Sequence, residues 1–213
     1  MTWEFIFGRF LTMLLVCQLG LILWNLRVVI RPKAGLPKSN ARVSLLIPAR
    51  NEEGFIGDCL RSLINQNHDN MEIIVLDDHS TDRTRAIIES QGAKVKLVSG
   101  KPIPAGWTGK NWACHQLSMQ ATGDVLFFID ADAILEPAAI SSVLHVMRAE
   151  NVDMVASLLR NQGTSFSSSI LLPIVNHAIL ALFPASLIHR SSNPDIALAF
   201  GPFIGVSRTL SLI

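Results

Sequence analysis

Apolar segments of strand length alternate with segments of helix length between Val43 and Ser157. The run Val43–Ile47 is continuously apolar and ends at Pro48, a pattern typical of a strand buried on both faces of a parallel sheet. The alternation repeats along the chain and predicts an α/β fold with a doubly wound, mostly parallel sheet. We expect strands at 43–47, 72–76, 95–98, 125–129 and 152–157, and helices at 53–66, 82–91, 110–121 and 137–150.

A second apolar pattern lies near the beginning of the chain. The 17 residues Phe10–Leu26 carry no charge and are flanked by Arg9 and Arg27, whose side chains can extend to lipid headgroups. About 20 apolar helical residues span a hydrocarbon core. A cleavable signal peptide is the alternative, but the basic residues follow the apolar run instead of preceding it. We therefore expect an uncleaved transmembrane anchor over 1–31 and a basic linker over 32–42.

The distribution of basic residues also predicts an orientation. They are concentrated after the apolar run, so the positive-inside rule places the rest of the chain in the cytoplasm. The expected location is the inner cell membrane, crossed once, with the remaining domain on the cytoplasmic side.

Composition narrows the class of protein. Charged residues make up 16% of the 213 residues, against about 25% in an average soluble domain, which disfavours disorder and a nucleic-acid partner. Of the 17 acidic residues, 15 lie between Glu52 and Asp153. The three cysteines and six histidines lack the spacing of a disulfide framework or a zinc site.

Polar clusters follow four of the predicted strands. Ligands of doubly wound sheets bind beyond the carboxyl ends of the strands, so these clusters are where chemistry is expected. They are Pro48–Glu53, Asp77–Asp82, Gly106–Lys110 and Asp130–Asp132.

The fourth cluster has the most specific chemistry. In LFFIDADAIL an apolar strand runs directly into Asp130 and Asp132. Carboxylates at this spacing can hold Mg²⁺ or Mn²⁺ together with substrate phosphate oxygens, and such an ion assists departure of a diphosphate. The structural alternative is that Asp130 caps the strand and Asp132 begins a turn.

The second and third clusters suggest a nucleotide. The side chains of Asp77 and Asp78 must point to opposite sides, so we expect one to be structural and the other to face the cleft, where it could accept from a nucleobase N–H. Lys110 opens a helix whose N–H groups favour an anion. A plain loop with a solvated lysine is the alternative.

Together the motifs VSLLIPARNEE, VLDDHSTDRT, GWTGKNWA and FFIDADAIL resemble, in this order, the family 2 glycosyltransferases. These are inverting nucleotide-sugar transferases of the GT-A fold. Within the family the resemblance is greatest to membrane-associated hopanoid and carotenoid-type lipid glycosyltransferases. It covers roughly Val43–Ser207, and we expect a GT-A domain over 43–213.

The resemblance implies transfer of a sugar, with UDP-sugar as the expected donor, to a lipid or polyisoprenoid-type acceptor at the membrane. It places Glu52 near the ribose or base, Asp78 on the base and Lys110 near the phosphates or base. Asp130 would lie near the ribose, and Asp132 would hold the Mn²⁺ or Mg²⁺ that bridges the diphosphate. The other implied donor-binding residues are Pro48, Ala49 and Asn51.

Inversion requires a general base, and its identity is unknown from the sequence. The family carries the base in an acidic motif beyond the strand that FGPFIGVSRTL resembles, and no such motif is present. Asp195, the one carboxylate after Asp153, is a weak candidate. We therefore expect a C-terminally truncated member that keeps the donor half, and whose activity is uncertain.

The apolar segment 170–188 contains Pro173, His177 and Pro184, which disfavour a second span and favour an interfacial segment that admits a lipid acceptor. Two other functions remain as alternatives. One is a non-catalytic nucleotide-binding remnant. The other is a phosphatase of the haloacid dehalogenase type, although that class carries its DxD on the first strand.

Overall fold

The computed structural model describes residues 3–28, 39–157 and 201–208. The predicted interfacial segment 170–188 and the candidate base Asp195 lie outside these residues. The chain divides into two compact units, and each is treated by itself. Helix α1 (Trp3–Val28) belongs to the first unit, whereas all described strands belong to the second.

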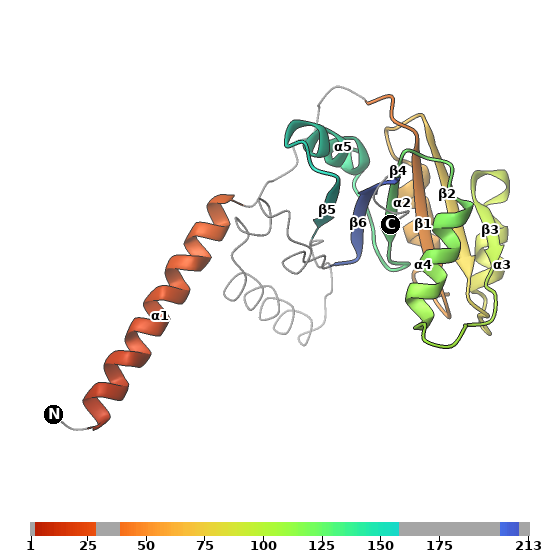
Figure 1. Cartoon of the computed structure of the whole chain (residues 1–213). Helices are drawn as coiled ribbons and strands as arrows, with labels where there is room; N and C mark the ends of the chain where they lie inside the picture. The colour runs from red at the N-terminus through yellow and green to blue at the C-terminus, as the bar shows by residue number, and fades with distance from the viewer. Residues whose placement is uncertain (1–2, 29–38, 158–200, 209–213) are drawn as a thin grey trace. The chain divides into compact units, whose positions relative to one another are not determined.

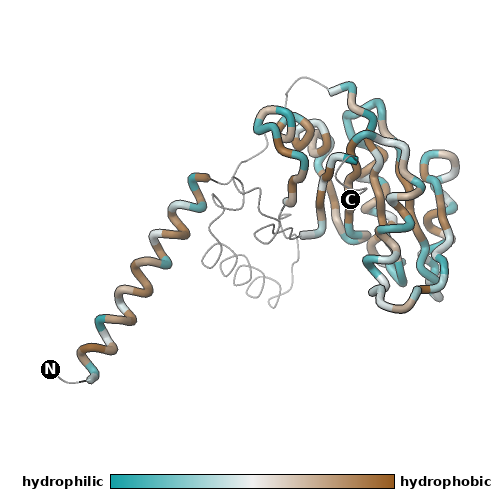
Figure 2. The backbone as a smooth tube through the Cα atoms, in the orientation of Figure 1, coloured by the Kyte–Doolittle hydropathy of each residue, from teal (hydrophilic) through white to brown (hydrophobic). Residues whose placement is uncertain are grey.

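Helix α1 has the length and composition of a membrane span (Figures 1 and 2). Its 26 residues rise about 39 Å at 1.5 Å per residue, which exceeds the roughly 30 Å of a hydrocarbon core. Among the described residues it is the one helix that could cross a membrane by these criteria. The anchor at 1–31 and the linker at 32–42 stay predictions.

The second unit contains the predicted alternation of strands and helices, with ends that differ by a few residues. The largest difference is at the start of α2, predicted at Glu53 and found at Ile56. The elements are β1 (Val43–Ala49), α2 (Ile56–Ile64), β2 (Met71–Asp77), α3 (Thr84–Glu89), a 3₁₀ turn (Gly92–Lys94), β3 (Lys96–Ser99), α4 (Gly109–Gln120), β4 (Val125–Ile129), α5 (Ala139–Ala149), β5 (Met154–Ser157) and β6 (Phe203–Ser207).

These strands form one six-stranded sheet in the order β3-β2-β1-β4-β6-β5. Strands β1 to β4 are parallel, with Val43 opposite both Met71 and Val125. Strand β6 is antiparallel to both of its neighbours and separates β4 from β5. The mostly parallel sheet is therefore confirmed, with an antiparallel insertion at one end.

Helices cover both faces of the sheet, as a doubly wound fold requires (Figure 1). On one face, side chains of α2 and α5 pack on β1 and β4 around Phe127 and Phe203, whose rings lie 5.2 Å apart. On the other face α4 packs through Leu117 on Leu46. Burial on both faces explains why β1 reads as a continuous apolar run.

A polar network around the buried Ser44 hydroxyl and the half-buried Glu72 ties β1 and β2 to the start of β4. The Ser44 hydroxyl donates to Glu72 Oε1 (2.6 Å) and accepts from the Gly123 N–H (2.9 Å). Glu72 also accepts from the N–H (2.6 Å) and hydroxyl (2.7 Å) of Thr122. Burial raises the pKa of Glu72, but the hydrogen bonds from Ser44 and Thr122 outweigh it and hold the pKa below 4.5.

This network predicts a pH-dependent stability. A lowered pKa in the folded state adds stability that is present above pH 4.5 and is lost as the pH falls through the folded pKa. We expect Glu72→Gln to lower the free energy of unfolding at neutral pH and to match the wild type at acidic pH, as measured by denaturant titration in detergent. In a Ser44→Ala background, the difference in free energy of unfolding between Glu72 and Glu72→Gln should change less with pH. In the wild-type background, a difference that is constant with pH would contradict this role.

Candidate functional site

The candidate site lies where β1 and β4 end. These strands are neighbours in the sheet. Strands β2 and β3 lie beyond β1 on one side, and β6 and β5 lie beyond β4 on the other. Such a reversal of strand order leaves a crevice at the carboxyl edge of the sheet. A cavity of about 250 Å³ opens there, lined by Pro48, Lys110, Asn111, Cys114, Phe128, Ile129, Asp130, Gly201 and Ile204.

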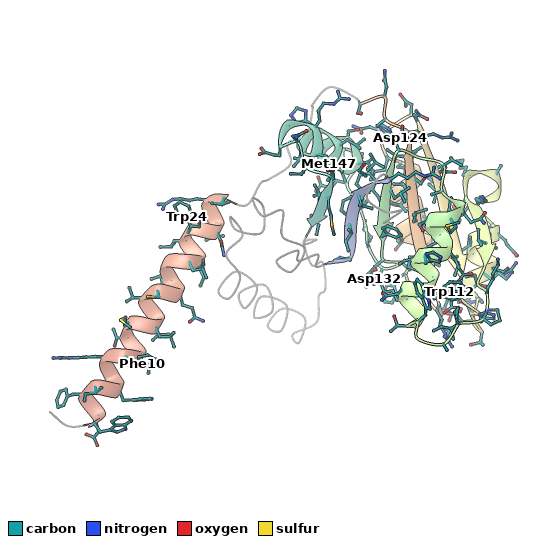
Figure 3. The ribbon with its side chains drawn as sticks, viewed as in Figure 1. Phe10, Trp24, Trp112, Asp124, Asp132 and Met147 are labelled. Atoms are coloured by element: carbon teal, nitrogen blue, oxygen red, sulfur yellow. The ribbon has the colours of Figure 1, made fainter. Side chains whose placement is uncertain are left out.

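Figure 3 shows how the sheet orders this region. Asp132, after β4, and Trp112, near the start of α4, lie toward the same end of the strands, whereas Asp124, before β4, lies toward the opposite end. The polar clusters identified in the sequence therefore share one edge of the sheet. Their spacing along the chain does not reveal which of them touch.

The loops after β1 and β2 are tied together by Asn51. Its backbone has φ of 55°, its N–H donates to Ser80 Oγ (3.0 Å), and its Oδ1 accepts from the Thr81 N–H (2.8 Å). The Glu52 N–H donates to Thr84 Oγ1 (2.7 Å). Asn51 therefore holds the two loops in place, a role that the sequence did not suggest for it.

Adjacent residues Asp77 and Asp78 have different environments. The Asp77 carboxylate is 5% exposed, accepts from the Ser80 N–H (3.1 Å) and pairs with Arg85 (3.4 Å). The Asp78 carboxylate is 20% exposed and lies 3.6 Å from Arg50 and 3.3 Å from His79. Asp77 is therefore held in the fold, whereas Asp78 keeps partial access to solvent, and its contact with a nucleobase stays a prediction.

Gly100 is required beside Asp78. A Cβ at residue 100 would lie 3.0 Å from Asp78 Oδ1 and 3.3 Å from the Asp77 carbonyl oxygen. The Gly100 N–H also donates to that carbonyl (2.9 Å). The absence of a side chain lets the loop after β3 approach the Asp78 carboxylate closely.

Lys110 and Asp130 form an ion pair across the cavity. The Lys110 Nζ lies 2.7 Å from Asp130 Oδ1, and both side chains line the cavity. The ammonium group is well exposed, since 63% of the Lys110 side chain is accessible. An anionic ligand could therefore reach the Lys110 ammonium group from solvent.

Carboxylates from separate loops converge on Glu52. Its pKa is raised by burial first, and then by the negative charges of Asp132, Asp130 and Asp82. Burial, followed by the charges of Asp132 and Asp130, raises the pKa of the Cys59 thiol to about 12. The loops that carry Glu52, Asp130 and Asp132 meet where β1 and β4 end, and a cation there would relieve the repulsion between their charges.

Asp132 has the properties of a metal ligand. Its side chain is exposed and makes no hydrogen bond or ion pair with another described residue. Ala131 and Ala133 on either side are buried in the core, and Asp132 lies between them in a turn that the Ala133 N–H closes onto the Asp130 carbonyl (3.0 Å). No group of three His, Cys, Asp or Glu in the described ranges could hold an ion unaided. Mg²⁺ or Mn²⁺ fits this donor set if a ligand supplies phosphate oxygens.

The side chains of the predicted residues Pro48 and Ala49 lie on opposite faces of the sheet, because consecutive strand residues alternate. Pro48 lines the cavity, whereas the Ala49 side chain is 2% exposed and lies in the core, so only the backbone of Ala49 can face a nucleotide. The Ala49 carbonyl still reaches this edge, where it accepts from the Asp78 N–H (2.8 Å).

Three residues near the site were not identified from the sequence. Arg50 pairs with Asp78, and Asn111 and Cys114 line the cavity beside Lys110. Helical spacing could have indicated Cys114, because residues four apart lie on one face of a helix. Nothing in the sequence alone indicated that Arg50 would pair with Asp78.

Comparison with known proteins agrees with this arrangement. Residues 44–211 match the protein-family model described as Glycosyl transferase family 2. A stretch of 117 residues is 37% identical to the 4,4'-diaponeurosporenoate glycosyltransferase of Staphylococcus haemolyticus and covers 54% of this chain and 31% of that protein. A stretch of 129 residues is 37% identical to the probable glycosyltransferase YdaM of Bacillus subtilis and covers 58% of this chain and 30% of that protein. The chain thus spans about a third of the length of these curated relatives.

Solved structures share the fold. The mannosyltransferase PcManGT from Pyrobaculum calidifontis, in complex with GDP-Man and Mn²⁺, is similar with a TM-score of 0.62 and 21% identity, over 93% of this chain and 55% of that one. Glucosyl-3-phosphoglycerate synthase of M. tuberculosis is similar with a TM-score of 0.52 and 23% identity, over 80% of this chain and 58% of that one. At these identities the likeness concerns the fold alone.

The Asn51 bridge generates a testable prediction. We expect Asn51→Ala to lower the free energy of unfolding by about 1–2 kcal/mol, because it removes the amide acceptor and leaves a less tolerant residue at positive φ. Asn51→Gly removes the same acceptor without backbone strain and should cost less. Denaturant titration of both variants separates the two contributions. If both variants unfold like the wild type, Asn51 does not hold the loops.

Proposed function

The chain belongs to glycosyltransferase family 2, and on this premise we propose that it transfers a sugar from a nucleotide-diphosphate donor, a UDP-sugar, to a lipid-type acceptor. The observation that carries the proposal is the convergence of Glu52, Asp130 and Asp132 beside Lys110 where β1 and β4 part. Clustered carboxylates with a nearby exposed lysine suit a diphosphate that is accompanied by a cation.

The nucleotide would occupy the carboxyl edge of the sheet, from Asp78 after β2 to the crevice where β1 and β4 part. The Asp78 carboxylate can accept an N–H of the base, since it remains accessible there. Pro48 would line the pocket, and Asn51 and Glu52 would shape it through the hydrogen bonds that fix the loop. Asp130 is suited to the ribose hydroxyls, because a carboxylate accepts hydrogen bonds from both.

Lys110 would exchange partners when the donor binds. Its ammonium group is paired with Asp130, and a diphosphate in the cavity would compete for it. The exchange would free the Asp130 carboxylate for the ribose while Lys110 neutralises phosphate charge. Asp130 would thus hold Lys110 in position before the donor binds, and Lys110 would neutralise phosphate charge afterwards.

Asp132 is the proposed metal ligand. A bound Mn²⁺ or Mg²⁺ would neutralise the charge that develops on the departing nucleoside diphosphate. The Asp132 carboxylate would bind the ion directly, and the repulsion that raises the pKa of Glu52 would favour a cation at the same place. The donor diphosphate would complete the set of oxygen ligands.

The acceptor is proposed to be a lipid, of polyisoprenoid or related type. Two observations support it: the named carotenoid glycosyltransferase relative, and helix α1, which could fix the chain at a membrane. In this proposal the chain crosses the inner cell membrane once, and the domain faces the cytoplasm, where nucleotide sugars are made available. Inversion also needs a general base, for which Asp195 remains a candidate from the sequence.

The two alternatives have different support. Asp130 and Asp132 follow β4, not β1, so the strand position typical of a haloacid dehalogenase nucleophile is not the one found. A non-catalytic nucleotide-binding remnant would share the donor site and lack turnover. Binding and turnover are therefore measured separately.

Calorimetric titration with UDP and Mn²⁺ tests the proposal. We expect Mn²⁺-dependent UDP binding by the full chain, and a loss of at least about 10-fold in affinity in Asp132→Asn, because even the loss of an indirect metal contact costs about 10–100-fold. Asp58→Asn is the control, since Asp58 is an exposed acid that pairs with Arg61 on α2.

Equal affinities of Asp132→Asn and the control would contradict the role of Asp132. Binding with no release of UDP from a UDP-sugar in the presence of lipid extract would favour the remnant. Metal-dependent hydrolysis of a phosphate ester without sugar transfer would favour the phosphatase.

A further inference from the structure

The loop between β3 and α4 exposes large apolar side chains beside the candidate site. We call residues 100–108 the Trp107 loop. Ile103 is 52% exposed and Trp107 is 42% exposed, although both are residues that proteins usually bury. The loop leads directly into Lys110, so it adjoins the cavity at the carboxyl edge of the sheet.

Hydrogen bonds hold the base of the Trp107 loop on α4. The Lys101 N–H donates to Gln116 Oε1 (2.8 Å), and the Lys101 carbonyl accepts from Trp112 Nε1 (3.0 Å). At the tip, the Trp107 N–H closes a turn onto the Pro104 carbonyl (3.3 Å), and Gly106 has φ of 84°, as the third residue of a type II turn requires. The apolar side chains are therefore presented by an ordered loop.

Aromatic contacts support only part of the Trp107 ring. Its centroid lies 5.3 Å from that of Trp112, in an edge arrangement, and 5.0 Å from that of His115. These contacts fix the orientation of the indole while much of it stays accessible. Trp is the residue typical of the bilayer interface, where an amphipathic ring meets both headgroups and acyl chains.

The segment of the chain that forms the Trp107 loop is basic, which suits an anionic partner for the loop itself. From Ser90 to Gly123 the chain contains no Asp or Glu, and of its four lysines Lys101 and Lys110 lie in or beside the loop, whereas Lys94 and Lys96 lie before and at the start of β3. The nearby carboxylates of Asp78 and Asp130 belong to other elements and are paired with Arg50 and Lys110. Anionic lipid headgroups attract such basic segments, each lysine near the surface contributing about 1 kcal/mol.

We propose that the Trp107 loop docks onto the anionic surface of a lipid bilayer, with Ile103 and Trp107 entering the interface and Lys101 lying among the headgroups. The ordered exposure of Ile103 and Trp107, the acid-free lysine segment and the membrane-length helix α1 together favour a bilayer over a protein or sugar partner. Docking would hold the cavity next to the membrane surface.

The chain length between α1 and β1 allows this orientation. Strand β1 has 7 residues and rises about 23 Å, so Val43 would stand roughly that far from a bilayer that meets the opposite edge. The 14 residues from Val29 to Arg42 can reach at most about 50 Å. An extended connection is therefore long enough for this orientation.

The proposal is tested by fluorescence quenching with brominated lipids. The full chain is reconstituted into vesicles of phosphatidylcholine and phosphatidylglycerol with brominated acyl chains. In a Trp3→Phe, Trp24→Phe background, emission comes from Trp107 and Trp112. Adding Trp107→Phe leaves Trp112 alone, and the difference between the two variants reports on Trp107.

A matched reporter is placed at the other end of the sheet. Met154→Trp, combined with Trp107→Phe, carries an exposed indole on β5, the edge strand opposite β3. We expect brominated lipid to cause a loss of the Trp107 emission and no loss at residue 154. Replacing Ile103 by Ser in the Trp107 reporter should reduce the quenching, and high salt should reduce it further.

Equal quenching at the two positions, or no quenching at Trp107, would overturn the proposal; a protein or sugar partner for the loop would give the second result. An unchanged far-UV circular dichroism spectrum of each variant shows that the domain is folded. Docking of the Trp107 loop does not depend on the identity of the acceptor. Absence of quenching would therefore leave the proposed sugar transfer intact, and absence of sugar transfer would leave the docking intact.

Discussion

Repulsion among carboxylates at one edge of the sheet is the constraint on which the rest of the site depends. Glu52 comes from the loop after β1, and Asp130 and Asp132 come from the loop after β4. The pKa of Glu52 is raised by its burial and by the charges of these two aspartates. Such a cluster costs stability unless positive charge offsets it. Lys110 supplies part of that charge through its pair with Asp130, and a bound cation would supply more.

The fold maintains this arrangement by fixing the loops from outside the cluster. Asn51 and Thr84 accept or donate the hydrogen bonds that join the first two loops, so the polar atoms of the acids are left for a ligand. At the opposite edge, the network of Ser44, Glu72 and Thr122 joins β1, β2 and the start of β4. The strands are therefore connected at both ends, and the carboxylates cannot easily separate to reduce their repulsion.

The sequence predicted the strands well because burial on both faces leaves an unmistakable apolar run, as in β1. It also placed Asp78 and Asp130 correctly at strand ends and Lys110 at the start of a helix. It could not predict the Lys110–Asp130 pair or the position of β6, because both depend on the order of strands in the sheet, which local periodicity does not contain. The burial of Ala49 could have been inferred from the period of two along β1.

The most direct test of the account is to locate manganese in crystals grown with UDP and Mn²⁺, using its anomalous scattering. The account predicts that the strongest anomalous peak is bonded to a carboxylate oxygen of Asp132 and an oxygen of the diphosphate, with Lys110 and Asp78 contacting the same nucleotide. A manganese peak at another place, or a nucleotide that leaves Asp78, Lys110 and Asp132 around separate cavities, would contradict it.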